Sequence, residues 1–233
     1  QQGVRPQVVD RAFSKLKAPS RKVVKYDRTQ PEARETFKRY RSRRGGAYRI
    51  ALGRRKYKKY RSLLDSVSAH YNVSPCFIMA LWGLETSYGH FRGSFPVVQS
   101  LATLAYDSRR SDFFRKELLF ALHILNQRQV DLPTFKGEWA GGSGHPQFLP
   151  SSWHHYAVDF NGDNRRDIWN NLPDAFASMA NYLLQNGWQP GAPWAIEVRL
   201  PRHFNTGLLG RKKVRTVGAW RRMGVKAVNR AFP

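Results

Sequence analysis

Apolar side chains recur at three- and four-residue spacing through most of this chain, which is the period of an amphipathic α-helix. The pattern predicts helices over residues 30–41, 53–71, 75–85, 97–106, 111–129, 150–157, 174–185 and 216–223. Between Ala12 and Arg28 no clear period is present, which predicts a loop or extended arm after a short first helix. Residues 194–200 read as a strand. The chain is therefore predicted to be mainly α-helical.

The helix predicted from Pro75 is the most apolar. Ser74 followed by Pro75 is a start signal, because a hydroxyl can cap the helix and the first turn does not use the N–H that proline lacks. Residues 77–84 are apolar on every side, which predicts a helix buried at the centre of the domain. Cys76 is expected to be a buried, inert thiol, and a single cysteine excludes an internal disulfide.

Length and charge narrow the class of protein. The 233 residues, 41% of them hydrophobic, suffice for a core, and no apolar stretch approaches the roughly 20 residues of a membrane-spanning helix. The net charge of +24 lies at the ends: residues 1–61 hold 21 Lys and Arg against 4 acids, residues 199–233 hold 10 against none, and residues 62–198 hold 9 against 12. Basic flanks favour adhesion to a polyanion around a near-neutral core. No base-reading motif accompanies them, which disfavours a nucleic-acid binder.

Glu85 is the first candidate for chemistry, because it ends the apolar run. Such an acid must be paired, raised in pKa, or exposed in a cleft. On pattern alone, a helix-end acid paired with an arginine is the more common case. The functional alternative is an acid kept protonated by apolar surroundings, which can protonate the leaving oxygen of a glycosidic bond.

The second candidate is the segment 131–148, which is rich in glycine and proline. Long ordered loops are usually functional, and the spacing of a phosphate-binding Walker motif is lacking. Glycines would let the backbone lie flush along an extended ligand. Gln147, with its amide, and Phe148, with its flat ring, are groups of the kind that bind sugars. A purely structural Ω-loop is an equal alternative.

The third candidate is an acidic loop in which oxygen-bearing side chains stand at positions 1, 3, 5 and 9 of a calcium-binding pattern: Asp159, Asn161, Asp163 and Asp167. Position 6 is Asn164, which can adopt the left-handed conformation usual for glycine there. Position 12 is Asn170 in place of glutamate, and Asp174 could supply the missing carboxylate. The alternative is a solvated turn neutralised by Arg165 and Arg166.

Several motifs in order strongly resemble the membrane-bound lytic murein transglycosylase B family: Leu-Trp-Gly-Leu-Glu-Thr-Ser-Tyr-Gly (81–89), Leu-Ala-Thr-Leu-Ala-Tyr-Asp (101–107), Gln-Phe-Leu-Pro-Ser-Ser (147–152), Val-Asp-Phe-Asn-Gly-Asp (158–163) and Ala-Asn-Tyr-Leu (180–183). The resemblance implies a lysozyme-like transglycosylase domain over 30–200 with little β structure. A basic arm with a short helix, 1–29, would precede it. A basic segment, 201–233, would follow as a truncated part of the same domain.

The resemblance also implies a mechanism. Glu85 is the single catalytic acid, which protonates the oxygen between N-acetylmuramic acid and N-acetylglucosamine and then acts as a base on the muramic acid's own 6-hydroxyl. The product is a 1,6-anhydro sugar. Because the nucleophile belongs to the substrate, the reaction needs neither a second carboxylate nor a cofactor.

The family's other site residues are carried over position by position. Gln147 and Tyr182 would contact the glycan, with Phe148 as a weaker choice, and Arg109 and Arg110 would pair with stem-peptide carboxylates. A structural Ca²⁺ would be held by the following residues, with Arg165 contributing its carbonyl: Asp159, Asn161, Asp163, Arg165, Asp167 and Asp174. A serine that commonly faces the catalytic acid in the family is Glu138 here, so we expect Glu138 to raise the pKa of Glu85 or to handle protons.

The resemblance places the protein in the periplasm, with an export signal removed before Gln1. Its expected partners are peptidoglycan strands and other cell-wall enzymes. The chain ends at Pro233, before the family's C-terminal segment, so it is either a short variant or an incomplete piece. Two rival functions are a non-catalytic peptidoglycan-binding scaffold and a nucleic-acid-binding protein.

Overall fold

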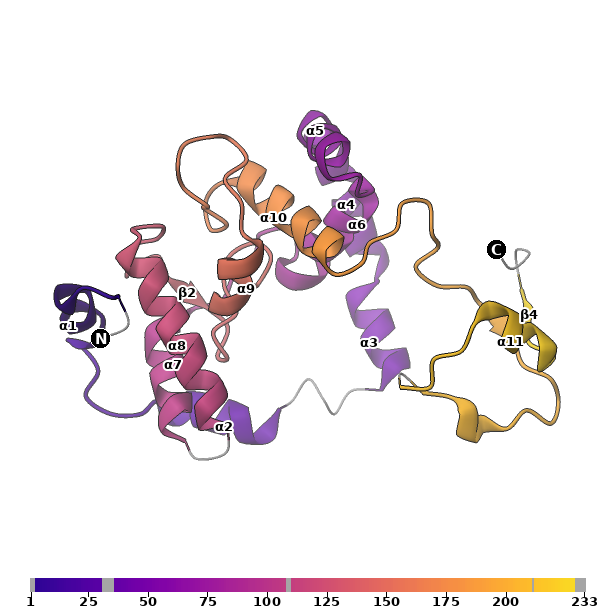
Figure 1. Ribbon diagram of the computed structural model, residues 1–233, viewed down its shortest axis with the longest axis horizontal. Coiled ribbons are helices and arrows are strands. Elements are labelled where there is room, and N and C mark those ends of the chain that lie inside the picture. The colour runs from indigo at the N-terminus through magenta and orange to yellow at the C-terminus, as the bar shows by residue number, and fades with distance from the viewer. Residues whose placement is uncertain (1–2, 31–35, 108–109, 211, 229–233) are drawn as a thin grey trace. The chain divides into compact units, whose positions relative to one another are not determined.

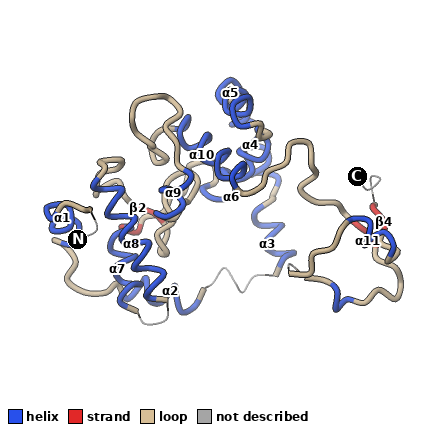
Figure 2. The backbone as a smooth tube through the Cα atoms, in the orientation of Figure 1, coloured by secondary structure: helices blue, strands red, loops and turns tan. Residues whose placement is uncertain are grey.

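The computed structural model describes residues 3–30, 36–107, 110–210 and 212–228. The chain forms two compact units, unit 1 from Gln1 to Pro190 and unit 2 from Gly191 to Pro233, so the division falls ten residues before the boundary expected from the sequence. Helices dominate unit 1, as Figures 1 and 2 show. Among the described residues, no helix combines the length and apolar character needed to cross a membrane.

The described helices of unit 1 are α1 Pro6–Phe13, α2 Arg21–Thr29, α3 Phe37–Arg44, α4 Ala47–Lys59, α5 Arg61–Tyr71, α6 Pro75–Thr86, α7 Val97–Tyr106, α8 Ser111–Asn126, α9 Pro150–Tyr156 and α10 Leu172–Gln185. Two short strands, β1 Phe95–Pro96 and β2 Lys136–Gly137, pair antiparallel. This mainly helical architecture confirms the predicted fold class, and α7 has the predicted bounds.

The predicted loop between Ala12 and Arg28 is wrong over α2. Ser20 caps this helix, since its hydroxyl accepts the N–H of Val23 at 3.4 Å. Val23 is buried and belongs to the core, but only three of the nine residues of α2 are apolar, Val23, Val24 and Tyr26, which is too few to mark a helix in the sequence. The helix predicted over 30–41 does not begin at Gln30, which is the left-handed C-cap of α2, and residues 31–35 lie outside the described residues. The described helix there is α3, capped by Thr36.

The single helix predicted over 53–71 is also wrong, because α4 and α5 meet at Tyr60, which leaves the helical conformation. The Tyr60 ring packs edge-on against Trp82 and Phe176, with centroid distances of 5.7 and 6.1 Å. Both helices turn apolar residues toward the same cluster, so the hydrophobic period continues across the break. Periodicity alone cannot reveal such a break.

The core of unit 1 has two clusters of buried side chains. One is built mainly on α7, α8, α9 and the strand segments, and the other on α5, α6 and α10. In α6, Ile78, Met79 and Trp82 are buried, whereas Leu84 is 38% exposed. The prediction that Cys76 is buried is wrong, because its thiol is exposed. Neighbouring helices cover only part of the α6 surface, which leaves one face open.

Helix α6 begins at Pro75 as predicted, although the Ser74 side chain makes no capping hydrogen bond. In the described part of unit 2 there are four short elements: β3 Val198–Arg199, η2 Thr206–Leu208, α11 Val217–Arg222 and β4 Lys226–Ala227. The strand predicted over 194–200 is thus reduced to β3, which pairs antiparallel with β4. Helix α11 lies within the predicted range, before Gly224 at a φ of 81°.

Candidate active site

Glu85 lies in the last turn of α6. Directly after the helix, Ser87, Tyr88 and Gly89 all have left-handed φ angles, of 50°, 61° and 83°. The N–H groups of Ser87 and Tyr88 bond back to the carbonyls of Gly83 and Trp82, at 3.2 and 3.1 Å, so the helix ends in a tight, fully bonded turn. This turn leaves the Glu85 side chain exposed at the end of an otherwise apolar helix.

The surroundings of Glu85 favour its protonated form. Although the side chain is accessible, the protein around it displaces enough water to raise the pKa of Glu85, and the positive charge of Arg44 partly opposes this rise. Arg44 itself is directed to the Leu84 carbonyl, at 3.4 Å. Within the described part of the chain Glu85 forms no salt bridge. The interpretation as a structural acid paired with an arginine therefore loses its main support.

Two glycines bring α4 and α6 close together behind Glu85. A Cβ on Gly83 would lie 2.7 Å from the Tyr88 ring, and one on Gly53 would lie 2.2 Å from the Tyr88 hydroxyl. Tyr88 therefore occupies the space that side chains on both helices would otherwise fill. Arg49 adds a hydrogen bond of 2.8 Å from its guanidinium to the Gly83 carbonyl. These contacts fix the end of α6 that carries Glu85.

A buried pair joins α6 to the glycine-rich segment. The Trp82 indole N–H donates to Nδ1 of His145 at 2.9 Å. Burial, and next the charge of Arg92, lower the pKa of His145 to about 4, so the ring is a neutral acceptor near neutrality. A Cβ on Gly89 would lie 2.6 Å from the His145 ring. Sequence reasoning missed His145, whose only signal was its place between Gly144 and Pro146.

The glycine-rich segment packs against other segments of the chain. Ser143 pairs with both Gly137 and Phe148, which adds to the β1–β2 ladder. A Cβ on Gly93 would lie 2.1 Å from the Gly137 carbonyl and 2.6 Å from the amide nitrogen of Glu138. The glycines were predicted to let the backbone lie close to a ligand. In the structure, the close backbone contact is made within the protein, between the segment that follows α6 and residues 137 and 138. The Glu138 side chain is exposed.

Gln147 holds this arrangement together. Its Nε2 donates to the carbonyl of Gly144 at 2.7 Å and to that of Arg92 at 3.3 Å. Its Oε1 is enclosed, with no hydrogen-bond partner in the described part of the chain. The amide that was predicted to bind a glycan thus connects two protein segments, and its contact to a glycan stays a prediction.

The rings of Phe148 and Tyr182 pack against each other at a tilt of 45°, so they do not present two open faces. Phe148 is 7% exposed, and its ring centroid lies 5.6 Å from that of Tyr182. Tyr182 also packs on Tyr156 at 5.0 Å and keeps a half-buried surface. Phe148 thus offers little area to a ligand, and of the two rings Tyr182 is the better candidate.

The Arg110 side chain already has partners within the protein. It forms an ion pair with Asp27, which is 3% exposed, and its guanidinium lies 4.9 Å from the centroid of the Phe114 ring. Its predicted carboxylate partner in a substrate therefore competes with a carboxylate of the chain itself. The other arginine of this prediction, Arg109, lies outside the described residues.

The acidic loop gathers three carboxylates. Oxygens of Asp159, Asp163 and Asp174 lie within 4.8 Å of one another. Asp174 is fully buried, and this burial raises its pKa, even though it accepts the N–H of Phe160 at 2.9 Å. Asn164 has a φ of 66°, which confirms the predicted left-handed turn. Three hard oxygen donors converging from a loop and a helix fit Ca²⁺.

The other predicted ligands are less clearly placed. Asn161 lies beside the three carboxylates, with its amide 2.9 Å from Asp163. One oxygen of Asp167 accepts the N–H groups of residues 169 and 170, so this carboxylate shapes the following turn. The Arg165 side chain donates to the carbonyl of residue 129, and Arg166 lies over the ring of Trp153. Neither arginine forms a salt bridge with the acids among the described residues, so neutralisation by these arginines is not supported.

Comparison with known protein sequences gives two findings. The family profile of the transglycosylase SLT domain matches residues 1–232. Membrane-bound lytic murein transglycosylase B of Escherichia coli is 35% identical over 156 residues, which are 64% of this chain and 43% of the relative. The chain thus spans less than half the length of this relative.

Two solved structures add to this. SltB3 from Pseudomonas aeruginosa, in complex with NAG-NAM-pentapeptide or NAG-anhNAM-pentapeptide, superposes with a TM-score of 0.92 at 40% identity, over 99% of this chain and 62% of that chain. Slt35 from Escherichia coli, in complex with calcium, superposes with a TM-score of 0.79 at 28% identity, over 95% and 74% of the two chains.

Proposed function

Since the chain belongs to the transglycosylase SLT domain family, whose lysozyme-like fold it has, we propose that it is a lytic transglycosylase of peptidoglycan. The observation that carries the proposal is Glu85, an exposed acid with a raised pKa at the end of an apolar helix. This arrangement does not support the scaffold alternative, because binding alone does not require an acid with a raised pKa. The nucleic-acid alternative explains the net charge alone.

In the first step Glu85 acts as a general acid. Its raised pKa keeps a proton available at higher pH than an ordinary glutamate would. The proton goes to the glycosidic oxygen between the two sugars as the bond from that oxygen to C1 of N-acetylmuramic acid breaks. The well-bonded turn after α6 and the contacts of Tyr88 hold the acid in position for this transfer.

In the second step the same carboxylate, now ionised, accepts the proton of the muramic acid's 6-hydroxyl. The hydroxyl oxygen bonds to C1 and closes the 1,6-anhydro ring, and Glu85 is protonated again. One carboxyl group therefore serves both steps. The occurrence of a NAG-anhNAM-pentapeptide in the SltB3 complex supports this product class for a protein 40% identical to the chain.

Glu138 is proposed to tune this acid. Its backbone is pressed against Gly93, a few residues after the end of α6. A carboxylate brought close to Glu85 would add like-charge repulsion to the effect of burial and so raise the pKa of Glu85 further. Replacement by Gln should then move the pH profile of activity downward, whereas an unchanged profile would rule out this role.

We also propose that the acidic loop holds a structural Ca²⁺ through Asp159, Asp163 and Asp174, with the other loop oxygens as further ligands. The ion would neutralise the converging carboxylates and take no part in bond cleavage. The calcium complex of Slt35 supports this assignment.

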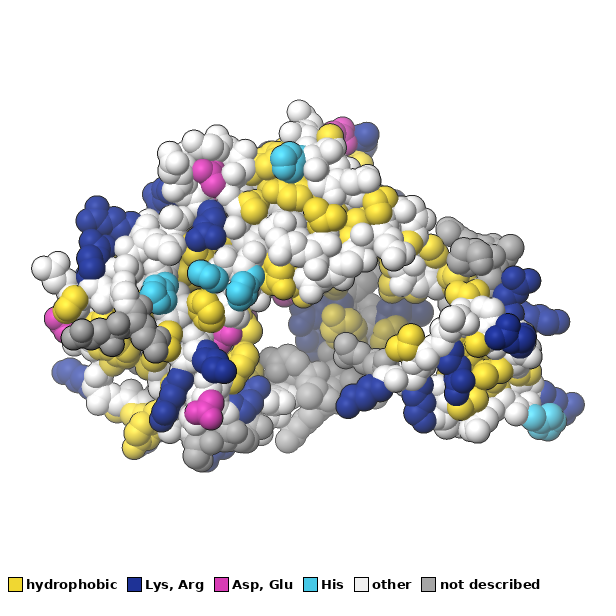
Figure 3. Space-filling view, viewed as in Figure 1, with side chains coloured by type: hydrophobic (Ala, Val, Ile, Leu, Met, Phe, Trp, Pro, Cys, Tyr) yellow, Lys and Arg dark blue, Asp and Glu magenta, His cyan; other side chains and the backbone are white. Residues whose placement is uncertain are grey.

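The proposed substrate lies in the bacterial cell envelope, so we propose that the protein acts there. On the face shown in Figure 3, Lys and Arg side chains far outnumber Asp and Glu. Such a surface favours salt-sensitive adhesion to an anionic wall.

The proposal is tested by mass spectrometry of the products that the protein releases from purified peptidoglycan. The Glu85→Gln variant should release none, while Glu197→Gln, which changes an exposed glutamate of unit 2 in the same way, should behave as the wild type. Anhydro-muropeptides from the wild type are the expected result. Products from the Glu85→Gln variant, or no products from a wild type that still binds the wall, would contradict the proposal.

A further inference from the structure

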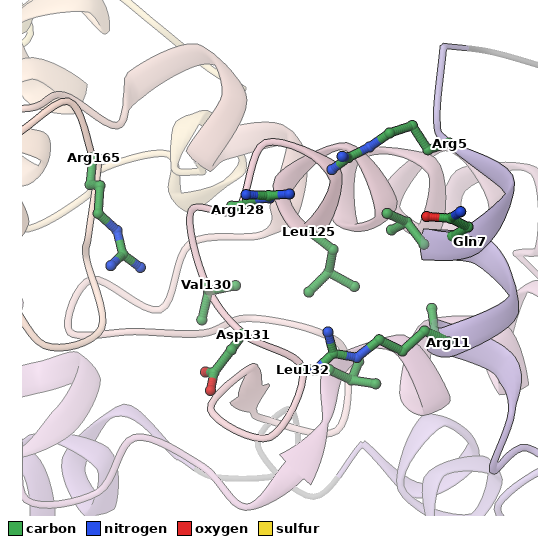
Figure 4. A pocket seen from close by; sticks show the side chains of 11 residues that line it. Arg5, Gln7, Arg11, Leu125, Arg128, Val130, Asp131, Leu132 and Arg165 are labelled. Atoms are coloured by element: carbon green, nitrogen blue, oxygen red, sulfur yellow. The ribbon is translucent and has the colours of Figure 1, made fainter.

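A pocket of about 440 Å³ lies in unit 1 between α1, the C-terminal end of α8 and the acidic loop (Figure 4). Four arginine side chains line it: Arg5, Arg11, Arg128 and Arg165. Its apolar lining is Val8, Ala12, Leu125, Val130 and Leu132. In Figure 1, α7 and α8 stand between α1 and the α6 helix of Glu85, so the pocket is separate from the candidate active site.

The positive charge of this pocket is not cancelled by its lining. The one acidic side chain there is Asp131, whose pKa is lowered first by a hydrogen bond with Thr134 and also by the charge of Arg11. This carboxylate is therefore ionised and engaged in its own turn. Four guanidinium groups against one carboxylate leave a net positive pocket that would attract an anion.

Two of the arginines are held in place by neutral acceptors. Arg5 donates from Nε to the Asn126 side chain at 2.9 Å and from Nη2 to the Asn126 carbonyl at 2.8 Å. Arg165 donates to the carbonyl of Gln129 at 3.2 Å. Such bonds orient a guanidinium without reducing its charge, and each group keeps further N–H donors for a ligand.

Arg128 gives an independent indication. It has a φ of 57°, because it lies in the left-handed turn that ends α8, where its N–H bonds back to the Leu125 carbonyl at 3.0 Å; asparagine adopts this conformation readily. Its side chain is exposed and forms no hydrogen bond or ion pair with the described residues. An exposed arginine at the wall of a pocket, with its guanidinium bound to no described residue, has all its N–H donors available for an anion.

We propose that this pocket binds a short acidic peptide, with its carboxylates on the arginines and its aliphatic parts on the apolar lining. Guanidinium groups bind carboxylates through paired hydrogen bonds. The five apolar residues favour a ligand with aliphatic groups over a small inorganic anion, and the volume is in the usual range for such a ligand. The origin of this peptide rests on the proposed function. If the protein acts on peptidoglycan, peptides of the cell wall would bind in this pocket and attach the enzyme at a second place, outside the candidate active site.

The test is a calorimetric titration of the full chain carrying Glu85→Gln, so that no turnover occurs. The probe is acetyl-Ala-Glu-Ala, which has two carboxylates, and the control ligand is its diamide. Arg128→Asn should weaken binding of the probe about tenfold. Asparagine suits the left-handed position, so this variant should fold, which its circular dichroism spectrum can verify. Arg115→Asn, on an exposed part of α8, should bind as before.

Three results would overturn the inference: unchanged affinity in Arg128→Asn, equal binding of the diamide, or displacement of the peptide by inorganic phosphate at lower concentration than the peptide itself requires. The last would assign the pocket to phosphate. Because the titration involves no catalysis, a protein that binds the probe but yields no anhydro products would refute the proposed function and leave the pocket assignment standing.

Discussion

Trp82 donates its indole N–H to Nδ1 of His145 at 2.9 Å, and this buried hydrogen bond ties the helix of Glu85 to the glycine-rich segment. The bond requires a neutral imidazole, because both nitrogens of a protonated ring are donors. Burial holds the pKa of His145 at about 4, so the folded protein resists protonation of this ring. The helix that carries Glu85 is therefore anchored by a group that is sensitive to acid.

We predict that the protein loses stability as the pH falls from about 6.5 to about 4. In this pH window His145 is protonated in the unfolded chain but stays neutral in the folded chain. The free energy of unfolding therefore falls with pH, by roughly 3 kcal/mol over the whole window. Urea unfolding at a series of pH values measures the slope. His145→Gln should flatten it and His90→Gln, at an exposed histidine, should not. Equal slopes in all three proteins would contradict this.

Gly83→Ala should destabilise unit 1 by about 1–3 kcal/mol, because the new Cβ would lie 2.7 Å from the Tyr88 ring. Thermal unfolding measures the loss. Gly218→Ala is the control, since its Cβ would meet nothing nearer than 3.7 Å. Tyr88→Ala should lower the free energy of unfolding less in the Gly83→Ala protein than in the wild type, because it removes the ring that the new Cβ meets. Strictly additive losses of stability in the double variant would count against the proposed clash.

Arg44→Gln should shift the alkaline decline of kcat/KM to higher pH. The charge of Arg44 lowers the pKa of Glu85, so its removal lets desolvation raise that pKa further and keeps the acid protonated longer. A pH–rate profile measures the shift. Arg55→Gln, on the exposed side of α4, should leave the profile unchanged. A decline that moves to lower pH in Arg44→Gln would refute this electrostatic account.

Calcium at a hundredfold excess over its Kd should raise the melting temperature by roughly 5–10 °C, since it binds only the folded acidic loop. Scanning calorimetry with and without a chelator measures the difference. Asp174→Asn should abolish it, because Asp174 is the fully buried carboxylate of the three. Asp65→Asn, which removes an exposed ion pair with Arg61, should retain it. A rise that persists in Asp174→Asn would place the ion elsewhere.

Local signals made most of the helices predictable. Helix α7 carries a regular apolar period, and Pro75 marks the start of α6 as expected. Where the period is weak or continuous, prediction failed: α2 has few apolar residues, and the break at Tyr60 falls within an unbroken pattern. Exposure of Cys76 depends on how much of α6 its neighbours cover, which no local pattern contains.

The candidate residues of the site could be found in the sequence, but not their connections. Residue type and spacing mark Glu85 and the carboxylates of the acidic loop as candidates, and the roles proposed for them come from the family resemblance. The Trp82–His145 bond spans 63 positions and the Arg110–Asp27 ion pair spans 83, so only the folded chain brings these partners together. The same applies to Gln147, whose amide bonds to the carbonyl of Arg92, 55 positions away.

The most direct measurement of the central claim is digestion of purified peptidoglycan in water labelled with a heavy oxygen isotope, followed by mass spectrometry of the products. If the muramic acid's own 6-hydroxyl attacks C1, the products are anhydro-muropeptides that carry no label and are one water lighter than hydrolysis products. Incorporation of the label at a reducing end would show that water is the nucleophile, and would contradict the mechanism proposed for Glu85.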